Sequence, residues 1–220
     1  MNFSRGTMRS SPYVGIFSEV SDSAALIPHA ILPKEQKAVE NTFECKIIKT
    51  SIGSTSLIGI LSKLFGEKLL VSEIVTKEEV KHLEKNGLEV MAMDGFSSIG
   101  NLIALNKNGG IASTLLSKEE VKAIEGFFKV KFIQMKIAGS DLPGAAITVT
   151  NKGFIAHPNI SEENFSRLEK IFGVNGEATT ANYGDLFVAN SVIANSKGVI
   201  AGQLTSGIEL SKIDQGLRGE

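Results

Sequence analysis

Four segments of the chain begin with a hydroxyl residue and continue with apolar residues at helical spacing. Behind Ser117, for example, the apolar positions are Val121, Ile124, Phe127 and Phe128. Such a pattern predicts a helix with one apolar stripe that faces a sheet. A Ser or Thr followed within three residues by an acid is typical of a helix N-cap. The caps recur at intervals of 41, 44 and 45 residues, at Thr76, Ser117, Ser161 and Ser206.

A strand, a tight turn and a second strand are predicted ahead of each helix. The turn glycines recur at intervals of 43, 44 and 45 residues, at Gly66, Gly109, Gly153 and Gly198. Turns such as Asn151-Lys152-Gly153 tolerate a positive φ. Short apolar runs flank them, at 102–105 and 111–112, at 145–149 and 154–156, and at 192–194 and 199–201. A third strand is expected after each helix, as at 88–93 and 130–135.

A weaker copy of the same pattern lies at the front of the chain. Residues 13–18 are predicted as its first strand, 21–23 as the turn and 25–27 as the second strand. Pro33 opens a helix, and residues 44–49 form a third strand.

Five copies of about 44 residues account for the 220 residues. A ββαβ unit cannot bury its apolar faces alone, so closure into a propeller-like ring is expected. This predicts one α/β domain with units at about 9–51, 52–95, 96–138, 139–182 and 183–220. The fifth unit ends before its third strand, so we expect a strand at about 2–8 to supply it.

Small residues join consecutive units, at 51–54, 98–101, 138–141 and 182–185. In a closed ring these joints are expected at equivalent positions, where they would form one continuous surface. Their glycines allow backbones to approach closely.

Composition narrows the function classes. The chain carries 23 Lys+Arg against 24 Asp+Glu, a balance that argues against binding nucleic acid through bulk positive charge. No run approaches the roughly 20 apolar residues that cross a membrane, and the N-terminus lacks the apolar segment of a secretory signal. We therefore expect a cytoplasmic protein that does not bind a membrane.

A catalytic constellation is missing from the sequence pattern. Cys45 is expected to be a small buried residue, and His29, His82 and His157 fall in three different units. The stretch 139–144 imitates the start of a phosphate-binding loop but lacks its lysine. Acidic pairs at 78–79, 119–120 and 162–163 fit the first turns of helices, where carboxylates are favourable. The residues therefore favour a binding protein with no cofactor and no metal.

Several motifs in order resemble the translation initiation factor 6 family in its archaeal form. They are residues 11–17 (SPYVGIF), 50–59 (TSIGSTSLIG), 99–106 (IGNLIALN), 149–153 (VTNKG) with His157-Pro158, 193–198 (IANSKG) and 205–210 (TSGIEL). The resemblance implies a pentein, a five-fold pseudosymmetric β/α propeller. It further implies a ribosome anti-association factor without enzymatic activity.

The family's role would place this chain on the large ribosomal subunit. The resemblance implies contact with ribosomal protein uL14, close to the sarcin–ricin loop of the ribosomal RNA. A bound monomer would sterically prevent joining of the small subunit, and it would also act in late maturation of the large subunit.

One site residue follows from the family's Leu-Gly-Asn motif, whose Asn matches Asn101. The alternative for Asn101 is a local turn cap after Gly100. The family's later Asn-Arg-Gly is Asn182-Tyr183-Gly184 here, so an aromatic residue replaces a charged donor. Ser98, Ser54, Asn182 and Tyr183 are the further candidates for ribosome binding.

Two alternatives stay open from the sequence. The pentein fold also hosts guanidine-modifying enzymes, which need a cysteine in a late joint, and the late units contain none. The other alternative is a repeat scaffold for a different protein partner.

Overall fold

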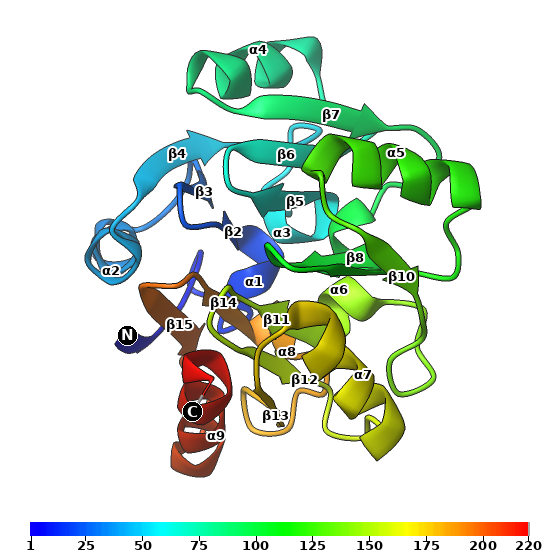
Figure 1. The fold of residues 1–220 in the computed structure, drawn as a ribbon. Coiled ribbons are helices and arrows are strands. Elements are labelled where there is room, and N and C mark those ends of the chain that lie inside the picture. Colours follow the sequence, from blue (N-terminus) through cyan, green and yellow to red (C-terminus); the bar gives the residue numbers. More distant parts are fainter. Residues whose placement is uncertain (220) are drawn as a thin grey trace.

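The computed structural model describes residues 1–219, which form five three-stranded sheets arranged around a common centre (Figure 1). In four of these sheets the first two strands in chain order pair antiparallel, and the third pairs parallel to the second. In the fifth, the last two strands of the chain pair antiparallel, and the first strand of the chain pairs parallel to the last. The first three sheets contain β2 (Glu19–Val20), β3 (Ala24–Pro28) and β4 (Lys46–Thr50); β5 (Ser62–Phe65), β6 (Lys68–Ser72) and β7 (Glu89–Met93); β8 (Ile103–Leu105), β9 (Gly110–Ala112) and β10 (Phe132–Gln134). The other two contain β11 (Ile147–Val149), β12 (Phe154–Ala156) and β13 (Gly176–Ala178); β14 (Val192–Ala194), β15 (Gly198–Gly202) and β1 (Asn2–Gly6).

The start of the chain completes the fifth sheet. β1 pairs parallel with β15, with Phe3 opposite Val199 and Arg5 opposite Ala201. The strand expected near residues 2–8 therefore lies beside the last unit, so the first and last parts of the chain are joined in one sheet. β1 thereby covers the edge of β15 and becomes the outer strand of the fifth sheet.

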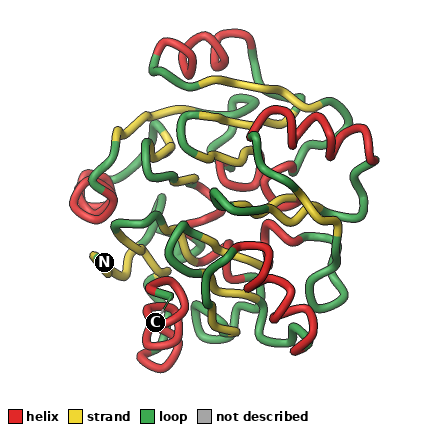
Figure 2. Tube along the Cα trace, in the orientation of Figure 1, coloured by secondary structure: helices red, strands yellow, loops and turns green. Residues whose placement is uncertain are grey.

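Among residues 1–219, five longer helices lie on the outside of the sheets (Figure 2). They are α2 (Pro33–Phe43), α4 (Lys77–Lys85), α5 (Lys118–Phe128), α7 (Glu162–Phe172) and α9 (Gly207–Arg218). The caps predicted at Thr76, Ser117, Ser161 and Ser206 are confirmed, because each side chain accepts a backbone N–H three residues on. Three of these caps have a glutamate at that third position, and α7 has Asn164 instead.

The described part of the chain also has five very short helices at the centre, which were not predicted. They are α1 (Val14–Phe17), α3 (Ile58–Leu61), η1 (Ile99–Leu102), α6 (Pro143–Ala146) and α8 (Val188–Ser191). The prediction of a strand at 13–18 was wrong, and the strand expected at 145–149 begins only at Ile147. A helix of four residues is too short to show a helical period, so its residues read as part of the following strand.

Glycines bring these central helices together. A β-carbon on Gly59 would overlap the carbonyl oxygen of Gly15, one on Gly100 that of Gly59, and one on Gly144 that of Gly100. A β-carbon on Gly15 would likewise overlap the carbonyl oxygen of Ala189 in α8. Since α6 also contacts α8, the five short helices form a ring around the centre.

Glycines in the hairpin turns also allow close contact, here between a turn and a neighbouring outer helix. Gly66 has a positive φ, whereas Gly109, Gly153 and Gly198 do not, although their turn sequences would tolerate one. A β-carbon on Gly153 would overlap the carbonyl oxygen of Gly216 in α9, and one on Gly198 that of Thr42 in α2. These residues are glycines because a neighbouring outer helix leaves no room for a side chain.

The strand directions give the molecule two ends. Because β3 runs antiparallel to β2 and parallel to β4, the start of β2 and the ends of β3 and β4 meet at one end. The other units repeat this arrangement. We call this end the helix-start rim, since both the short and the outer helices begin there. The opposite end, with the hairpin turns and the ends of the outer helices, is the hairpin rim.

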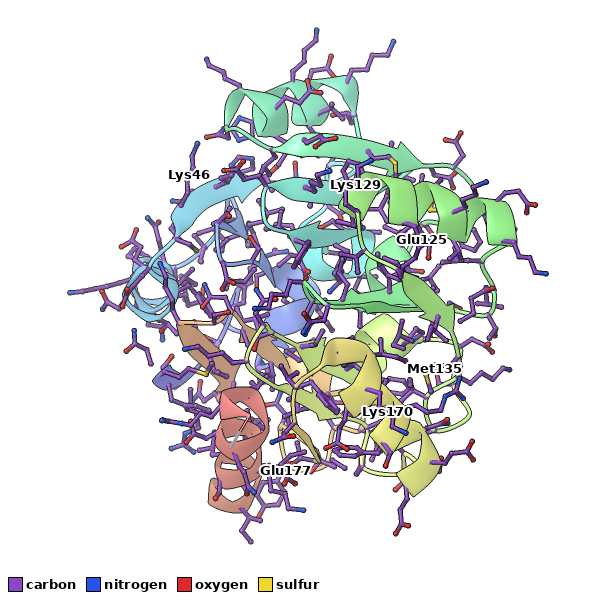
Figure 3. All side chains as sticks on the ribbon, in the orientation of Figure 1. Lys46, Glu125, Lys129, Met135, Lys170 and Glu177 are labelled. Atoms are coloured by element: carbon purple, nitrogen blue, oxygen red, sulfur yellow. The ribbon has the colours of Figure 1, made fainter. Side chains whose placement is uncertain are left out.

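Side chains of one unit bind the end of the next unit's helix at the hairpin rim. Lys46, which Figure 3 labels on β4, donates to the carbonyl of Asn86 after α4. Lys68 does the same for Phe127 in α5, and Asn106 for Phe172 in α7. Asn175 reaches Gly219 after α9, and Asn195 reaches Phe43 in α2. Helix-end carbonyls that have no partner within their own helix are thus satisfied around the whole ring.

Candidate interaction surface

Exposed apolar side chains concentrate at the helix-start rim. Of the ten large apolar side chains that are exposed among the described residues, only Ile133 lies within a strand. The other nine lie in the loops and helix starts of this rim: Tyr13, Leu32, Leu57, Ile74, Leu115, Tyr183, Leu186, Leu204 and Ile208. Apolar patches of this kind on an otherwise polar surface mark protein interaction sites.

Asn101 lies in the central ring, on η1. Its backbone N–H donates to the carbonyl of Ser98 at 3.0 Å, but its half-buried side chain has no hydrogen-bond partner among the described residues. The side chain therefore does not cap the turn, which was the alternative left open by the sequence. Asn190 occupies the same place in α8, and its side-chain amide likewise has no hydrogen-bond partner in the described chain. The alignment of Gly100-Asn101 with Ala189-Asn190 could have identified it.

Ser98 and Ser54 come from structurally different places. Ser98 is the half-buried N-cap residue of η1, and its side chain makes no capping hydrogen bond. Ser54 lies in the loop that precedes α3 and is exposed, with φ of 58°. The expectation that all joints are equivalent was wrong for 98–101, because this segment forms the short helix rather than the loop before it.

Asn182 and Tyr183 are neighbours with opposite surroundings. The Asn182 amide is buried and donates to the carbonyl of Pro12 and to Ser191 Oγ, both at 2.8 Å. Its Oδ1 accepts the backbone N–H of Leu204 at 3.2 Å, so the side chain ties the fifth unit to the first. Tyr183 is 84% exposed, which leaves its ring free for a partner.

Three glutamates hold the loops of this rim in shape. Glu79 accepts the backbone N–H groups of Gly53 at 2.8 Å and Ser54 at 2.9 Å, and the hydroxyl of Ser51 at 2.6 Å. Burial raises the pKa of the Glu79 carboxyl, but these hydrogen bonds and one from the Thr76 backbone lower it below its usual value. Glu35 and Glu209 make the same contacts in the loops at 7–11 and 180–185, with the same direction of pKa shift.

The inner strands enclose a narrow channel. Lys63 Nζ on β5 lies 2.9 Å from Glu19 Oε1 on β2, and both side chains are largely buried. Burial raises the pKa of Glu19 and outweighs the lowering by Lys63. A cavity of about 130 Å³ lies at the hairpin end of the channel. This is below the volume of most small-molecule sites.

The candidate chemical residues do not assemble into a catalytic group. Cys45 is half-buried just before β4, and burial raises the pKa of its thiol to about 11. His29 and His82, which seemed unrelated in sequence, face each other across two units with ring centroids 6.3 Å apart. Across residues 1–219 no cluster of three or more His, Cys, Asp or Glu side chains is arranged to hold a metal ion. None of the described helices has the length and apolar character needed to cross a membrane.

Comparison with known proteins matches nearly the whole chain. The model of the eIF-6 family matches residues 3–216. The chain belongs to the eIF-6 family. A translation initiation factor 6 from Staphylothermus marinus is 30% identical over 224 residues, covering 100% of this chain and 99% of the relative. One from Methanobrevibacter smithii is 35% identical over 208 residues, covering 94% of this chain and 93% of the relative.

A solved structure supports the architecture. The crystal structure of a dimethylarginine dimethylaminohydrolase adduct aligns with a TM-score of 0.50 at 15% identity, covering 93% of this chain and 72% of the enzyme. At this identity the likeness shows the fold alone. The fold is the five-fold pseudosymmetric pentein that the family resemblance implied, and its five units are those that the repeats predicted.

Proposed function

We propose that this eIF-6 family protein is a translation initiation factor that binds the large ribosomal subunit and sterically prevents its association with the small subunit. The same binding would let it act in late maturation of the large subunit. Ribosomal protein uL14, close to the sarcin–ricin loop, is the proposed contact. The protein would act as a monomer in the cytoplasm, without a cofactor.

The observation that carries this proposal is the apolar helix-start rim. The rim exposes nine large apolar side chains, two of them tyrosines, and the core of a protein–protein interface is more apolar than the rest of the surface and enriched in aromatic residues. Asn101 adds a side-chain amide that makes no hydrogen bond within the described chain, and Tyr183 adds an exposed aromatic ring. Ser54 and Ser98 lie in the same rim, whereas the Asn182 side chain would support the surface from beneath.

The mechanism needs no chemistry. A rigid ring attached by one rim would occupy the surface that the small subunit needs. The rival reading as a guanidine-modifying enzyme needs a reactive thiolate, and Cys45 is half-buried with a pKa of about 11. It also lies in the first unit rather than in a late one.

Sedimentation of purified protein with purified ribosomal subunits tests the proposal. The protein should co-sediment with large subunits and reduce the amount of joined ribosomes when small subunits are added. Sedimentation with small subunits alone, or with neither, would contradict it. Tyr183→Ala is expected to weaken co-sedimentation, and Ile133→Ala, on the strand outside the rim, should leave it unchanged.

A further inference from the structure

The loop at 137–140 on the helix-start rim lacks the helix glutamate that binds three sister loops, at 8–11, 52–55 and 181–185. The loops at 8–11 and 52–55 have the same form, in which two central residues with positive φ lie between a pair of antiparallel bridge residues. In each, the two central N–H groups point to one carboxylate. Arg9 and Ser10 donate to Glu35 at 3.0 and 2.8 Å, and Gly53 and Ser54 donate to Glu79 at 2.8 and 2.9 Å.

The loop at 181–185 repeats this contact with one extra residue. Tyr183 and Gly184 donate to the two oxygens of Glu209 at 3.2 and 3.0 Å. Backbone N–H groups that converge in this way form an anion-binding concavity. Three units of the same chain therefore show directly that this loop form binds a carboxylate through both oxygens.

The loop at 137–140 has the same backbone. Ala138 and Gly139 have φ of 50° and 81°, and Ile137 and Ser140 exchange backbone hydrogen bonds at 3.0 and 2.9 Å. The backbone N–H groups of Ala138 and Gly139, however, have no acceptor among the described residues. Gly139 is exposed, and its α-carbon faces open space. The loop leaves the end of β10, just after Met135, which Figure 3 labels.

Two residue differences between the units explain why no internal carboxylate binds the N–H groups of Ala138 and Gly139, which we call the cradle. The third residue of α7 is Asn164, where α2, α4 and α9 have Glu35, Glu79 and Glu209. Lys136 lies two residues before Ala138. The same position holds Thr7 ahead of the loop at 8–11 and Ser51 ahead of the loop at 52–55, and the hydroxyls of both bind the glutamate. The internal anion is thus lost and a cation is gained in the same unit.

We propose that the cradle, together with Lys136, binds a carboxylate from the ribosomal protein partner, either an Asp or a Glu side chain. The inference rests on the proposed function, because the loop lies on the helix-start rim. Lys136 donates to Asp141 Oδ2 at 3.0 Å, and Asp141 also accepts the hydroxyl of Thr114. The negative charge of Asp141 is therefore balanced by Lys136. The Lys136 ammonium has three N–H groups, so others remain for an incoming anion.

Acetate tests the cradle in the isolated protein. Amide signals of Ala138 and Gly139 should shift when sodium acetate replaces sodium chloride at constant ionic strength. The amides of Gly53 and Ser54, already bonded to Glu79, are the internal control and should not move. Unchanged Ala138 and Gly139 signals would overturn the site, whatever the sedimentation of the protein with large subunits shows.

Asn164→Glu tests the partner. This variant restores the sister arrangement, so the cradle should fill from within. The Ala138 and Gly139 amides should shift without acetate, the unfolding temperature should rise by about 2–4 °C, and large-subunit binding should weaken about tenfold. Asn164→Gln, of equal length without charge, should leave all three unchanged.

The outcomes separate the two proposals. An acetate response combined with undiminished subunit binding by Asn164→Glu would overturn the partner carboxylate while leaving the proposed function standing. Amides of Ala138 and Gly139 that do not move in Asn164→Glu would overturn the equivalence of the loops. A wild-type chain that fails to co-sediment would overturn the proposed function, with the acetate response still deciding the site.

Discussion

A glutamate at the third position of an outer helix does two things in this protein. Glu79 accepts the backbone N–H of Thr76 within its own helix start, and it also binds the loop at 52–55. The first contact could be predicted from the capping pattern, because both partners lie three residues apart. The second could not, since its partners are separated by more than 20 residues and no local pattern records them.

Glu79→Gln should lower the free energy of unfolding by about 1–3 kcal/mol at pH 7, since an amide cannot accept all the N–H groups that the carboxylate does. The folded pKa of Glu79 lies below its ordinary value of 4.5, so its stabilising effect is complete above that pH. It is lost as the pH falls through the lower, folded pKa. Chemical denaturation of both proteins between pH 7 and pH 3 should therefore show a difference that shrinks only below pH 4.5.

Glu78→Gln is the matched control. Glu78 also lies in the first turn of α4, but its carboxylate makes no hydrogen bond to a loop among the described residues. Its unfolding free energy should stay within about 0.5 kcal/mol of the wild type. A Glu79→Gln variant as stable as this control would contradict the assigned role of the carboxylate.

Asn101→Ser should weaken large-subunit binding about tenfold, since it removes an amide that has no internal partner. The unfolding temperature should change little, because no hydrogen bond within the described chain is lost. Co-sedimentation and thermal unfolding measure the two effects separately. A large loss of thermal stability with unchanged binding would make Asn101 a structural residue.

The outer helices and the central helices differ in how much of them the sequence predicts. An outer helix such as α5 has a cap, a stripe of buried residues over three turns and a definite end, so its position follows from pattern. The central helices have four residues each, and their geometry depends on glycines that meet the backbone of another unit. That dependence is tertiary, and it is why 13–18 was predicted as a strand.

Gly153→Ala and Gly126→Ala should have opposite effects on stability. A methyl group on Gly153 would overlap the carbonyl of Gly216, so the variant should lose about 3 kcal/mol of unfolding free energy. Gly126 is exposed in α5, and a β-carbon there meets no atom within 4 Å. Because alanine favours the helix more than glycine does, Gly126→Ala should gain about 0.8 kcal/mol.

Denaturant unfolding at equilibrium measures both variants under the same conditions. If both variants lost the same amount of unfolding free energy, the close contact assigned to Gly153 would not explain its loss. A tolerated Gly153→Ala would show that α9 can move away from the hairpin.

At the scale of the whole molecule, the repeat interval predicts five units, and the missing last strand predicts ring closure through the start of the chain. β1 occupies that place beside β15. What the sequence did not reveal is the difference between the two rims. Side chains such as Lys46 and Asn195 look like ordinary surface residues until the next unit's helix end is seen beside them.

Removing residues 1–6 should open the ring, because it exposes the edge of β15 and part of the apolar cluster around Phe3. The shortened chain should unfold at a markedly lower temperature. Adding a synthetic peptide of residues 1–8 should raise the unfolding temperature, and the rise should grow with the logarithm of the peptide concentration once that concentration exceeds Kd. A peptide with Phe3 replaced by Asp is the control, and it should have no effect.

The central circle of backbone contacts has one step unlike the rest. At four positions a glycine lies against the carbonyl of the preceding short helix, but the residue at the same position in α8 is Ala189. A methyl cannot fit into the space that the other steps leave, so the two helices there cannot come as near to each other. Under mechanical load or high temperature, the molecule should therefore first part between its fourth and fifth units rather than where its two ends meet.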